Sequence, residues 1–461
     1  MKSVSDIVDQ VLFVSLLAII PIVVIPYGTV DAWWEAIFEC LVFFLTAIWI
    51  LKATFASGWQ LRKLSLVFPL IVLTAYAFLQ AIQWPSTSGT AAPRMLSVDH
   101  YQTYLTARKL LALTLFLAAL LTHTSTAKRF RWCVKTIIAV GLGSALFGIL
   151  RQFLQSPESN QGFILSFLFY GIGYGQFISP NAFAYVMELT LGLLLGLILG
   201  GGVRRNRVLI YAAILAVVWT ALVLSNSRGG LLSLGGQVVF VLLVSLNWYL
   251  DRKLSSGEEA QRWMIFLRQS KLVRALGIIF VLGGLTAGVF WIGGINLANK
   301  MAGDTEVEQA GPDGSTRQEI WRASGRMFRN NLWTGVGFGA YYLAIPQYQV
   351  GSGRLKLEQA HNDYLDLAAS GGIIGLVLSA WFVTILIGRA RASFKQHDGY
   401  QRAAALGAVT GMLGVGIHSF VDFGLQVTAV AIMFATLVVI VVADVRTESS
   451  RLLSHRVARK R

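Results

Sequence analysis

Long apolar stretches alternate with short polar connections along almost the whole chain. A helix needs about 20 largely apolar residues to cross the hydrocarbon core of a membrane, and twelve stretches meet or approach that length. They lie at residues 10–26, 34–55, 65–83, 104–123, 134–153, 181–200, 208–225, 229–250, 275–295, 371–388, 403–421 and 426–444. The pattern predicts an all-α polytopic membrane protein with about twelve transmembrane helices.

One connection is much longer than the others. Residues 296–370 separate the ninth and tenth predicted helices, and a connection of that length in a compact protein usually has a function. Within it, Ile320, Met327 and Phe328 recur at helical spacing beside a row of arginines, which predicts a short basic amphipathic helix. The chain therefore divides into helices one to nine (1–295), the long connection (296–370), helices ten to twelve (371–445) and a basic tail (446–461).

Composition agrees with a membrane setting. Hydrophobic residues make up 55% of the 461 positions and charged residues only 13%, whereas soluble domains carry about 25% charged residues; the mean hydropathy is +0.62. Cys40 and Cys133 lie in or beside apolar stretches, so they predict neither a disulfide framework nor a zinc site. The first apolar stretch is too long for a signal peptide and no cleavage pattern follows it, so we expect a retained helix.

The lysines and arginines predict the orientation of the helices, because cytoplasmic connections retain positive charge. With the N-terminus in the cytoplasm, roughly two thirds of the 39 basic residues fall on that side. Both termini are then cytoplasmic, and residues 296–370 lie on the outer, periplasmic face. The net charge of +16 is then explained by topology and by contact with anionic lipids, and we expect membrane lipids rather than nucleic acid as partners.

The stretch "AHNDYLDLAASGGIIGL" places polar side chains directly before the tenth predicted helix. His361 is the best candidate for a catalytic base, because an imidazole can be unprotonated near neutral pH, and Asn362 and Asp363 are candidate supporting residues. We expect Ser370 to cap the helix. A helical path from the glycines back to His361 spans roughly 15 Å, which places His361 near the lipid headgroups. Alternatively, His361 is a hydrogen-bonded residue at a helix N-terminus.

Arg228 and Arg317 are the best candidates for binding phosphate on the outer face. Arg228 follows "SNS" in a tight turn between two predicted helices, and a guanidinium donates two charge-assisted hydrogen bonds to one phosphate. Alternatively, Arg228 reaches lipid headgroups, and Arg317 pairs with Glu319 or Asp313. Arg322 is a possible further phosphate contact, although the arginines of this helix more often form a solvated stripe.

Four further polar residues lie at or near helix ends. Pro180 suits the first position of a helix, and Asn181 together with Ser179 can cap the first turn. Glu188 lies two turns inside the membrane, where an ionisable group is usually functional or paired, and we expect an arginine as its partner. His418 and Asp422 are four residues apart and could face each other on one side of the eleventh helix, where a structural hydrogen bond is expected.

Several motifs occur here in one order. They are "F-x-x-P-N-x-F-A", "S-x-S-R-G-G", "R-x-x-I-W" followed by "G-V-G-x-G", "H-N-D-Y-L" followed by "G-x-I-G-L", and "H-S-F-V-D-F". Together, over about residues 95–435, they resemble the O-antigen ligase and O-antigen polymerase superfamily of bacterial membrane glycosyltransferases. The chain departs from the family pattern at Ser370, where relatives often have a glutamate. Any role of that glutamate is absent or relocated in this chain.

The resemblance implies a GT-C-like helical fold in the bacterial inner membrane and a donor glycan carried on undecaprenyl diphosphate. The glycan would pass to lipid A core or another glycan acceptor, by metal-independent inverting displacement and without a cofactor; the chain has no P-loop. In that reaction His361 would be the base, and Arg228 and Arg317 would clamp the diphosphate. A repeat-unit polymerase, a protein O-oligosaccharyltransferase and a non-enzymatic transporter remain alternatives. A transporter is disfavoured, because we find no internal repeat.

Overall fold

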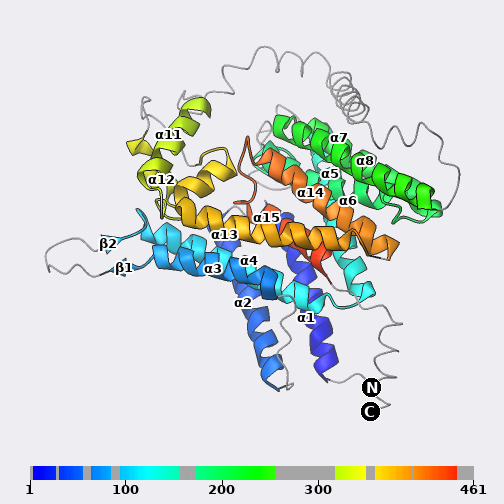
Figure 1. Cartoon of the computed structure of the whole chain (residues 1–461), viewed down its shortest axis with the longest axis horizontal. Helices are drawn as coiled ribbons and strands as arrows, with labels where there is room; N and C mark the ends of the chain where they lie inside the picture. Colours follow the sequence, from blue (N-terminus) through cyan, green and yellow to red (C-terminus); the bar gives the residue numbers. More distant parts are fainter. Residues whose placement is uncertain are drawn as a thin grey trace. The chain divides into compact units, whose positions relative to one another are not determined.

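The computed structural model describes residues 4–26, 28, 31–55, 64–84, 94–155, 168, 173–255, 317–348, 359–396 and 398–443. These residues are mostly helical (Figure 1). Eight of their helices are long and apolar enough to span a membrane, and two shorter apolar helices cover 65–80 and 428–442, so the chain is a polytopic membrane protein. A further helix, Gly399–His418, coincides with the eleventh predicted stretch. The ninth predicted stretch, 275–295, lies outside the described residues.

The long helices fall into two compact units. The bounds are α1 (Val4–Val24), α2 (Ala32–Phe55), α3 (Leu64–Gln80), α4 (His100–His123), α5 (Ala127–Leu154), α6 (Pro180–Leu199), α7 (Val208–Leu224), α8 (Arg228–Ser255), α13 (Asp363–Ser393), α14 (Gly399–His418) and α15 (Thr428–Val442). The first unit comprises Met1–Val140, Glu306–Arg391 and Ser419–Arg461, and the second comprises Gly141–Thr305 and Ala392–His418.

In the first unit, α4 packs against α1, α2, α3 and α15. Two ion pairs fasten α4 to α2: Arg108 Nε lies 2.5 Å from Glu39 Oε2, and Lys109 Nζ lies 2.5 Å from Glu35 Oε1. Between α3 and α4, the strands β1 (Gln83–Trp84) and β2 (Arg94–Met95) form a short antiparallel pair. Charged groups within these apolar helices are therefore neutralised by each other, as membrane interiors require.

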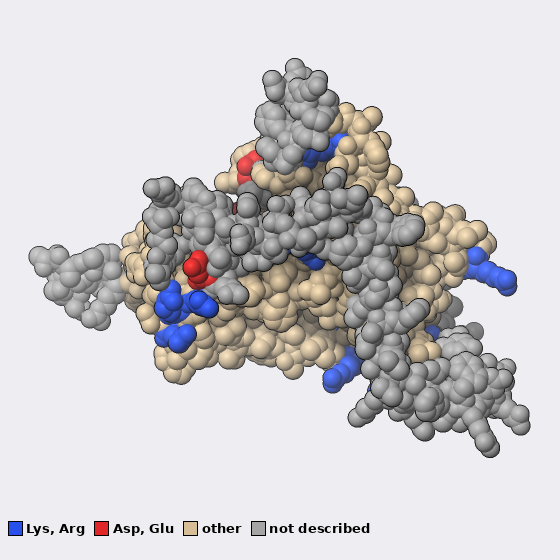
Figure 2. Space-filling model, turned by 90° about the horizontal axis from the view of Figure 1, so that it is seen from above, with Lys and Arg blue, Asp and Glu red and all other residues tan. Residues whose placement is uncertain are grey.

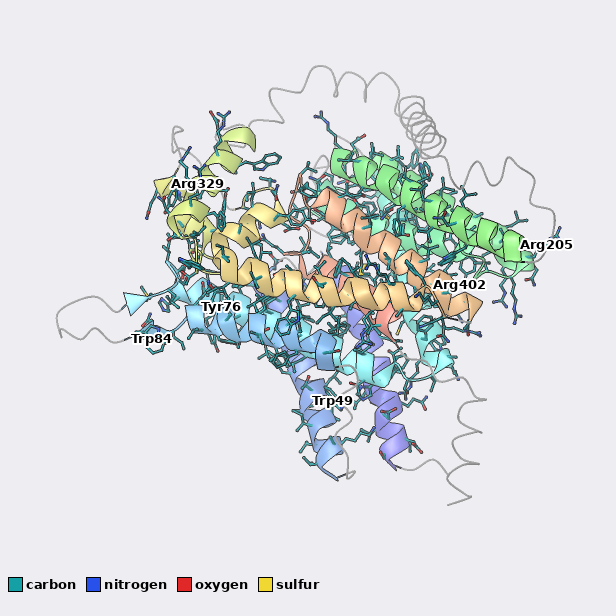
Figure 3. All side chains as sticks on the ribbon, in the orientation of Figure 1. Trp49, Tyr76, Trp84, Arg205, Arg329 and Arg402 are labelled. Atoms are coloured by element: carbon teal, nitrogen blue, oxygen red, sulfur yellow. The ribbon has the colours of Figure 1, made fainter. Side chains whose placement is uncertain are left out.

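In the second unit, α6 packs against α14, α7 and α8. Glycines permit the closest approach: a Cβ added to Gly192 of α6 would lie 2.2 Å from the backbone nitrogen of Gly411 in α14. Small residues at helix contacts let the two backbones come together in this way. At another contact, the guanidinium of Arg402 lies over the ring of Trp248, 5.1 Å from its centre; Figure 3 labels Arg402 on α14.

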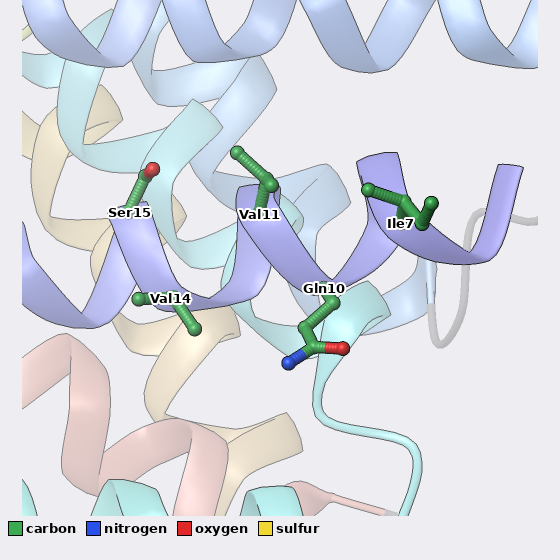
Figure 4. A pocket seen from close by; sticks show the side chains of 5 residues that line it. All are labelled: Ile7, Gln10, Val11, Val14 and Ser15. Carbon is green, nitrogen blue, oxygen red and sulfur yellow. The ribbon is translucent and has the colours of Figure 1, made fainter. Parts of the chain in front are cut away.

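The part of the described surface that is visible in Figure 2 is mostly uncharged. Figure 2 shows lysine, arginine and acidic side chains in small groups separated by wide uncharged areas. A shallow hollow on α1 is lined by Ile7, Gln10, Val11, Val14 and Ser15 (Figure 4), and three of these are apolar side chains that are more than half exposed. Such a surface suits contact with lipid tails, and this hollow presents no ionisable group.

The predicted amphipathic helix is present as α11 (Arg317–Asn330). Ile320 and Met327 are buried in a small core shared with Tyr341 of α12 (Tyr341–Ala344) and with Ile345, the first residue of the 3-10 helix η3 (Ile345–Gln347). This confirms Ile320 and Met327 as the apolar face of the helix, and the Phe328 side chain is partly buried. The earlier part of the long connection, 296–316, lies outside the described residues.

A helical segment that we did not predict precedes the tenth predicted stretch. α13 starts at Asp363 rather than at residue 371, and its helical path is broken at Gly372, where φ is 62°. A Cβ at Gly372 would lie 2.4 Å from the carbonyl oxygen of Trp333, so only glycine fits both the backbone angle and the space. The polar motif therefore lies on a helical segment before the break, and the helix that follows the break corresponds to the tenth predicted stretch.

The break leaves carbonyl groups that need other partners. Ser370 O accepts from Gly337 N at 3.0 Å and from Gln80 Nε2 at 3.2 Å, and Gly371 O accepts from the Tyr76 hydroxyl at 3.1 Å; Figure 3 labels Tyr76 on α3. The Ser370 hydroxyl donates to Asp366 Oδ1 at 3.2 Å. Ser370 is thus inside the helix and does not cap it, contrary to our expectation.

Candidate functional site

His361 lies immediately before α13 and has a left-handed backbone, with φ at 47°. That conformation is uncommon for a residue other than glycine, and the next residue fixes it. Asn362 Oδ1 accepts from the backbone N–H groups of Tyr364 and Leu365, both at 3.0 Å, which is the action of a helix N-cap. Asn362 Nδ2 also donates to Phe420 O at 2.9 Å, so this turn is tied to the segment that follows α14.

Asp363 strengthens the same tie. Its Oδ2 accepts from the Ser419 hydroxyl at 2.8 Å and from the backbone N–H groups of Gly424 and Leu425 at 3.0 and 3.2 Å. Burial raises the cost of a carboxylate, and three donors to one oxygen offset that cost. Asn362 and Asp363 are therefore supporting residues in a structural sense, because they position the backbone on both sides of His361.

The side chain of His361 pairs with Asp422. His361 Nδ1 and Asp422 Oδ1 are 3.2 Å apart, with the Asp422 side chain 4% exposed and the His361 side chain 36% exposed. A carboxylate only accepts hydrogen bonds, so Nδ1 carries a proton, and in the neutral imidazole Nε2 is then an acceptor. Asp422 is itself fixed by the N–H of Phe423 at 2.9 Å. A partly exposed imidazole oriented by a buried carboxylate is the arrangement of a general base.

This pairing corrects our expectation that Asp422 bonds His418. α14 ends at His418, so Asp422 lies beyond the helix and the two residues do not share a helical face. The partner of His418 is Glu188 of α6: His418 Nδ1 and Glu188 Oε1 are 2.6 Å apart, and both side chains are 0% exposed. We expected an arginine beside Glu188, and a histidine contacts it.

The His418 ring is also held by stacking. Tyr185 lies parallel to it, with ring centres 4.0 Å apart and an angle of 14° between the planes. On α8, a Cβ added to Gly229 would lie 2.2 Å from His418 Nε2, so the glycine of "S-R-G-G" allows α8 to pack directly on this ring. The buried pair is thus enclosed by α6, α8 and α14, all in the second unit.

Asn181 and Arg228 lie at the two helix starts of the same unit. Ser179 caps α6 and Pro180 is its first residue, as expected of this sequence, whereas Asn181 Oδ1 accepts from the Ser227 hydroxyl at 2.7 Å. Asn181 therefore links α6 to the turn before α8 and is not the cap we expected. Arg228 is exposed and is the first residue of α8.

The arginines of α11 divide into two kinds. Arg322 and Arg329 are exposed, as a solvated stripe would be, and Figure 3 labels Arg329 on this helix. Arg326 donates to the backbone oxygen of Tyr348 at 2.6 Å, so it binds α11 to the segment after η3. Arg317 is the first residue of α11, and the contacts of its side chain lie outside what the structure describes.

Gln80 is a residue that the sequence analysis missed. It is 0% exposed at the end of α3, where its Nε2 donates to Thr334 O at 2.6 Å and its Oε1 accepts from Phe338 N at 3.2 Å. Together with its bond to Ser370 O, these contacts attach α3 to the "G-V-G" segment and to the break in α13. The only signal in the sequence is one amide side chain at the end of an apolar stretch.

A second attachment holds the long connection to the first unit. The Tyr342 hydroxyl donates to Asp99 Oδ2 at 2.6 Å, and Asp99 Oδ1 caps α4 by accepting from the N–H groups of Tyr101 and Gln102, both at 3.1 Å. Burial by itself raises the pKa of Asp99, but the hydrogen bonds from Tyr342 and from the two amides outweigh it and lower that pKa below its ordinary value. The same bond, together with burial, raises the pKa of Tyr342.

The two histidine clusters use residues from distant parts of the sequence. Each is complete within one unit, and "H-S-F-V-D" contributes His418 to one cluster and Asp422 to the other. Among the described residues, no three histidine, cysteine or acidic side chains converge as metal ligands do.

In a comparison with known protein families, residues 210–380 match the family described as O-Antigen ligase. The matched segment includes Arg228, Arg317 and His361, and it is narrower than the range over which we noted motifs, so Glu188 and Asp422 lie outside it. No curated protein matches the chain. The family match confirms the resemblance that the motifs indicated and places residues 210–380 in the O-antigen ligase superfamily.

Proposed function

We propose that this protein transfers a glycan from an undecaprenyl-diphosphate-linked donor to a sugar hydroxyl of lipid A core. The observation that carries this proposal is the pair of His361 and Asp422, a partly exposed imidazole whose Nδ1 is bonded to a buried carboxylate. In a protein of the O-antigen ligase superfamily, such a pair suits the removal of a proton from an acceptor hydroxyl.

The proposed step is a single displacement. His361 Nε2 takes the proton from the acceptor hydroxyl while the acceptor oxygen bonds to the anomeric carbon of the donor sugar. The bond from that carbon to the diphosphate oxygen breaks, and its electron pair leaves with the lipid diphosphate. Attack opposite the leaving group inverts the anomeric centre. General-base catalysis of this kind typically contributes about 10² to 10⁴ in rate.

Charge that grows on the leaving diphosphate needs cations or oriented donors. Arg228 is a candidate because it is exposed at the first position of α8, where the helix dipole also favours an anion. Arg317 is a candidate at the first position of α11, and the exposed Arg322 one turn later is a possible third contact. These assignments are proposals for each arginine separately.

The distribution of basic residues supports a location for this chemistry. It favours cytoplasmic termini in the inner membrane, with α11, α12 and the start of α13 on the periplasmic face. A donor whose lipid is embedded in the same membrane would present its diphosphate at headgroup level, and the His361 motif adjoins a membrane-spanning stretch.

The purified protein in lipid vesicles tests the proposal. It would receive the lipid-linked glycan and lipid A core in the presence of a chelator and without nucleotide, and glycan attached to lipid A core is the expected product. A ladder of longer glycans formed from the donor alone would instead identify a polymerase. Glycan attached only to an added acceptor protein would identify a protein transferase.

Further variants and controls in the same assay test the arginines assigned to the diphosphate. Arg228→Gln and Arg317→Gln should each slow transfer, and Arg329→Gln, an exposed arginine of α11, is the matched control. Donor flipped across the bilayer without any transfer would show a transporter and refute the enzyme. A strict requirement for a divalent cation would refute the arginine clamp.

A further inference from the structure

Lys109 connects α4 to the segment that carries Asp422. Its side chain is 18% exposed within a helix that is long and apolar enough to span a membrane. Its Nζ pairs with Glu35 Oε1 of α2 at 2.5 Å and also donates to Gln426 O at 2.8 Å. The same Glu35 oxygen accepts from the Thr428 hydroxyl at 3.0 Å. An ionisable group at such a place is usually paired or functional, and these contacts extend beyond the ion pair itself.

Residues 419–427 join α14 to α15 and are held from two directions. From the start of α13, Asn362 and Asp363 bond this segment on both sides of Asp422. From α4, Lys109 bonds its last part. Because residues 419–427 form no regular helix that would order them, these bonds determine where the Asp422 carboxylate lies.

Gln426 joins the two directions. Its backbone oxygen accepts from Lys109, and its side chain hydrogen-bonds Asp366 in the first turn of α13. Asp366 is 9% exposed and also accepts from the backbone N–H of Ala360, which directly precedes His361. Gln426 thereby links Lys109 to residues on both sides of the candidate base.

The neighbouring ion pair offers a comparison within the same two helices. Arg108 of α4 pairs with Glu39 of α2 and so joins these helices as Lys109 does. In the part of the chain that the structure describes, neither of its side chains bonds residues 419–428. An ion pair between α2 and α4 therefore needs no contact with that segment, and the contacts of Lys109 with it have another role.

We propose that Lys109, paired with Glu35, is a positioning residue for the pair of His361 and Asp422. The ammonium fixes the last part of residues 419–427 against α4 and so keeps Asp422 at bonding distance from His361. With the carboxylate displaced, the neutral ring would also exist with its proton on Nε2, the nitrogen that must accept the proton of the sugar hydroxyl. The inference rests on the proposed function, because this positioning matters for catalysis only where His361 is the base.

The test compares Lys109→Met with Arg108→Met, since each variant loses one ion pair between α2 and α4. In the glycan-transfer assay we expect the kcat of Lys109→Met to fall about ten- to a hundredfold, because a misplacement of about 1 Å can cost about 10² in rate. Each KM should stay unchanged, since Lys109 acts through Asp422 and not on a substrate. The kcat of Arg108→Met should equal that of the wild type. Equal losses in the two variants, or a rise in KM alone, would overturn the proposal.

A second readout does not require activity. The full-length protein in lipid vesicles would carry isotope-labelled histidine, of which the chain has six, and the His361 signals are those absent from His361→Asn. At alkaline pH, the NMR shifts of the ring nitrogens show which nitrogen carries the proton. We expect protonated Nδ1 in the wild type and in Arg108→Met, and a mixture with protonated Nε2 in Lys109→Met. Protonated Nδ1 alone in Lys109→Met would overturn the proposal, whereas a wild type without transfer activity would refute only the proposed function.

Thr428→Val decides the question if Lys109→Met does not fold. It keeps the branched shape and removes only the hydroxyl that bonds Glu35. We expect kcat to fall about fivefold, less than in Lys109→Met because one of the two contacts remains, with the same change in the His361 ring. Thr436→Val is the matched control, since that hydroxyl bonds Ile432 O within α15. Thr428→Val that matched Thr436→Val in both readouts would overturn the proposal.

Discussion

His361 and His418 each bond a carboxylate through Nδ1, yet their surroundings differ at every level. The His361 side chain is 36% exposed beside Asp422, whereas His418 and Glu188 are both 0% exposed. The backbone of His361 is left-handed before a helix, and His418 is the last residue of α14, stacked on Tyr185. The same pair of chemical groups thus occurs once at a surface and once in a core.

The difference shows which pair can meet a substrate. A base must come within hydrogen-bond reach of the proton that it removes, and a side chain with no exposed surface cannot do so without rearrangement. A buried histidine and glutamate that bond each other fix one packing of three helices. The motif that contains His418 therefore serves the packing of α6, α8 and α14. The motif that contains His361 is suited to a catalytic base.

Replacing His361 should have the largest effect on activity. His361→Asn is the sharpest change, because asparagine tolerates a left-handed backbone but cannot act as a base. We expect glycan transfer to fall by about 10² to 10⁴ and the thermal midpoint to stay unchanged. His100→Asn, at an exposed histidine that begins α4, is the matched control. Transfer by His361→Asn at the rate of that control would remove His361 from catalysis.

Replacing His418 should have the largest effect on stability. His418→Leu leaves the Glu188 carboxylate in a site with no exposed surface, and breaking a buried pair in this way costs about 3–5 kcal/mol. The free energy of unfolding, measured with denaturant in detergent, should fall by that amount. The double variant Glu188→Leu with His418→Leu should recover most of the loss, since no lone charge remains. A double variant no more stable than His418→Leu would contradict this account.

The positions and lengths of the apolar stretches were enough to predict most of the long helices that the structure describes. The apolar stretches are long, and a membrane helix satisfies its own backbone hydrogen bonds, so hydropathy locates it without knowledge of neighbours. The helical segment from Asp363 to Ser370 was not predicted, because the break that ends it at Gly372 is stabilised by Gln80 and Gly337, which lie far away in the sequence.

Individual residues of the candidate site could be singled out from the sequence, but the sequence did not indicate which of them contact each other. His361 and Asp422 both stood out, but their 61-residue separation offers no spacing rule, and the rule for residues four apart joined Asp422 to the wrong histidine. That rule requires one continuous helix, and α14 ends at His418. Asn181 was misread for a similar reason, because Ser227 binds it from another helix start.

A smaller effect on stability is expected from a substitution at Gly229, which packs against His418. A Cβ at Gly229 would lie 2.2 Å from His418 Cδ2 and Nε2, and overpacking of a core costs about 1–3 kcal/mol. Gly229→Ala should therefore lower the thermal midpoint. Gly143→Ala is the control within α5, since nothing lies within 4 Å of the added Cβ, and alanine favours a helix by about 0.5–1 kcal/mol. Gly229→Ala matching Gly143→Ala in stability would show that the His418 ring is not tightly packed.

The smallest effect concerns the pair of Tyr342 and Asp99, which is only partly buried, unlike His418 and Glu188. Because the folded pKa of Asp99 is lowered, its contribution is complete above the unfolded value of about 4 and is lost as the pH falls through the lower folded value. Tyr342→Phe should reduce stability by less than about 1 kcal/mol at neutral pH, after allowance for solvent screening. Thermal midpoints measured between pH 7 and pH 3 should show this difference constant at first and shrinking below about pH 4. A difference that grew on acidification would mean that Tyr342 stabilises protonated Asp99, the reverse of the role that the lowered pKa indicates.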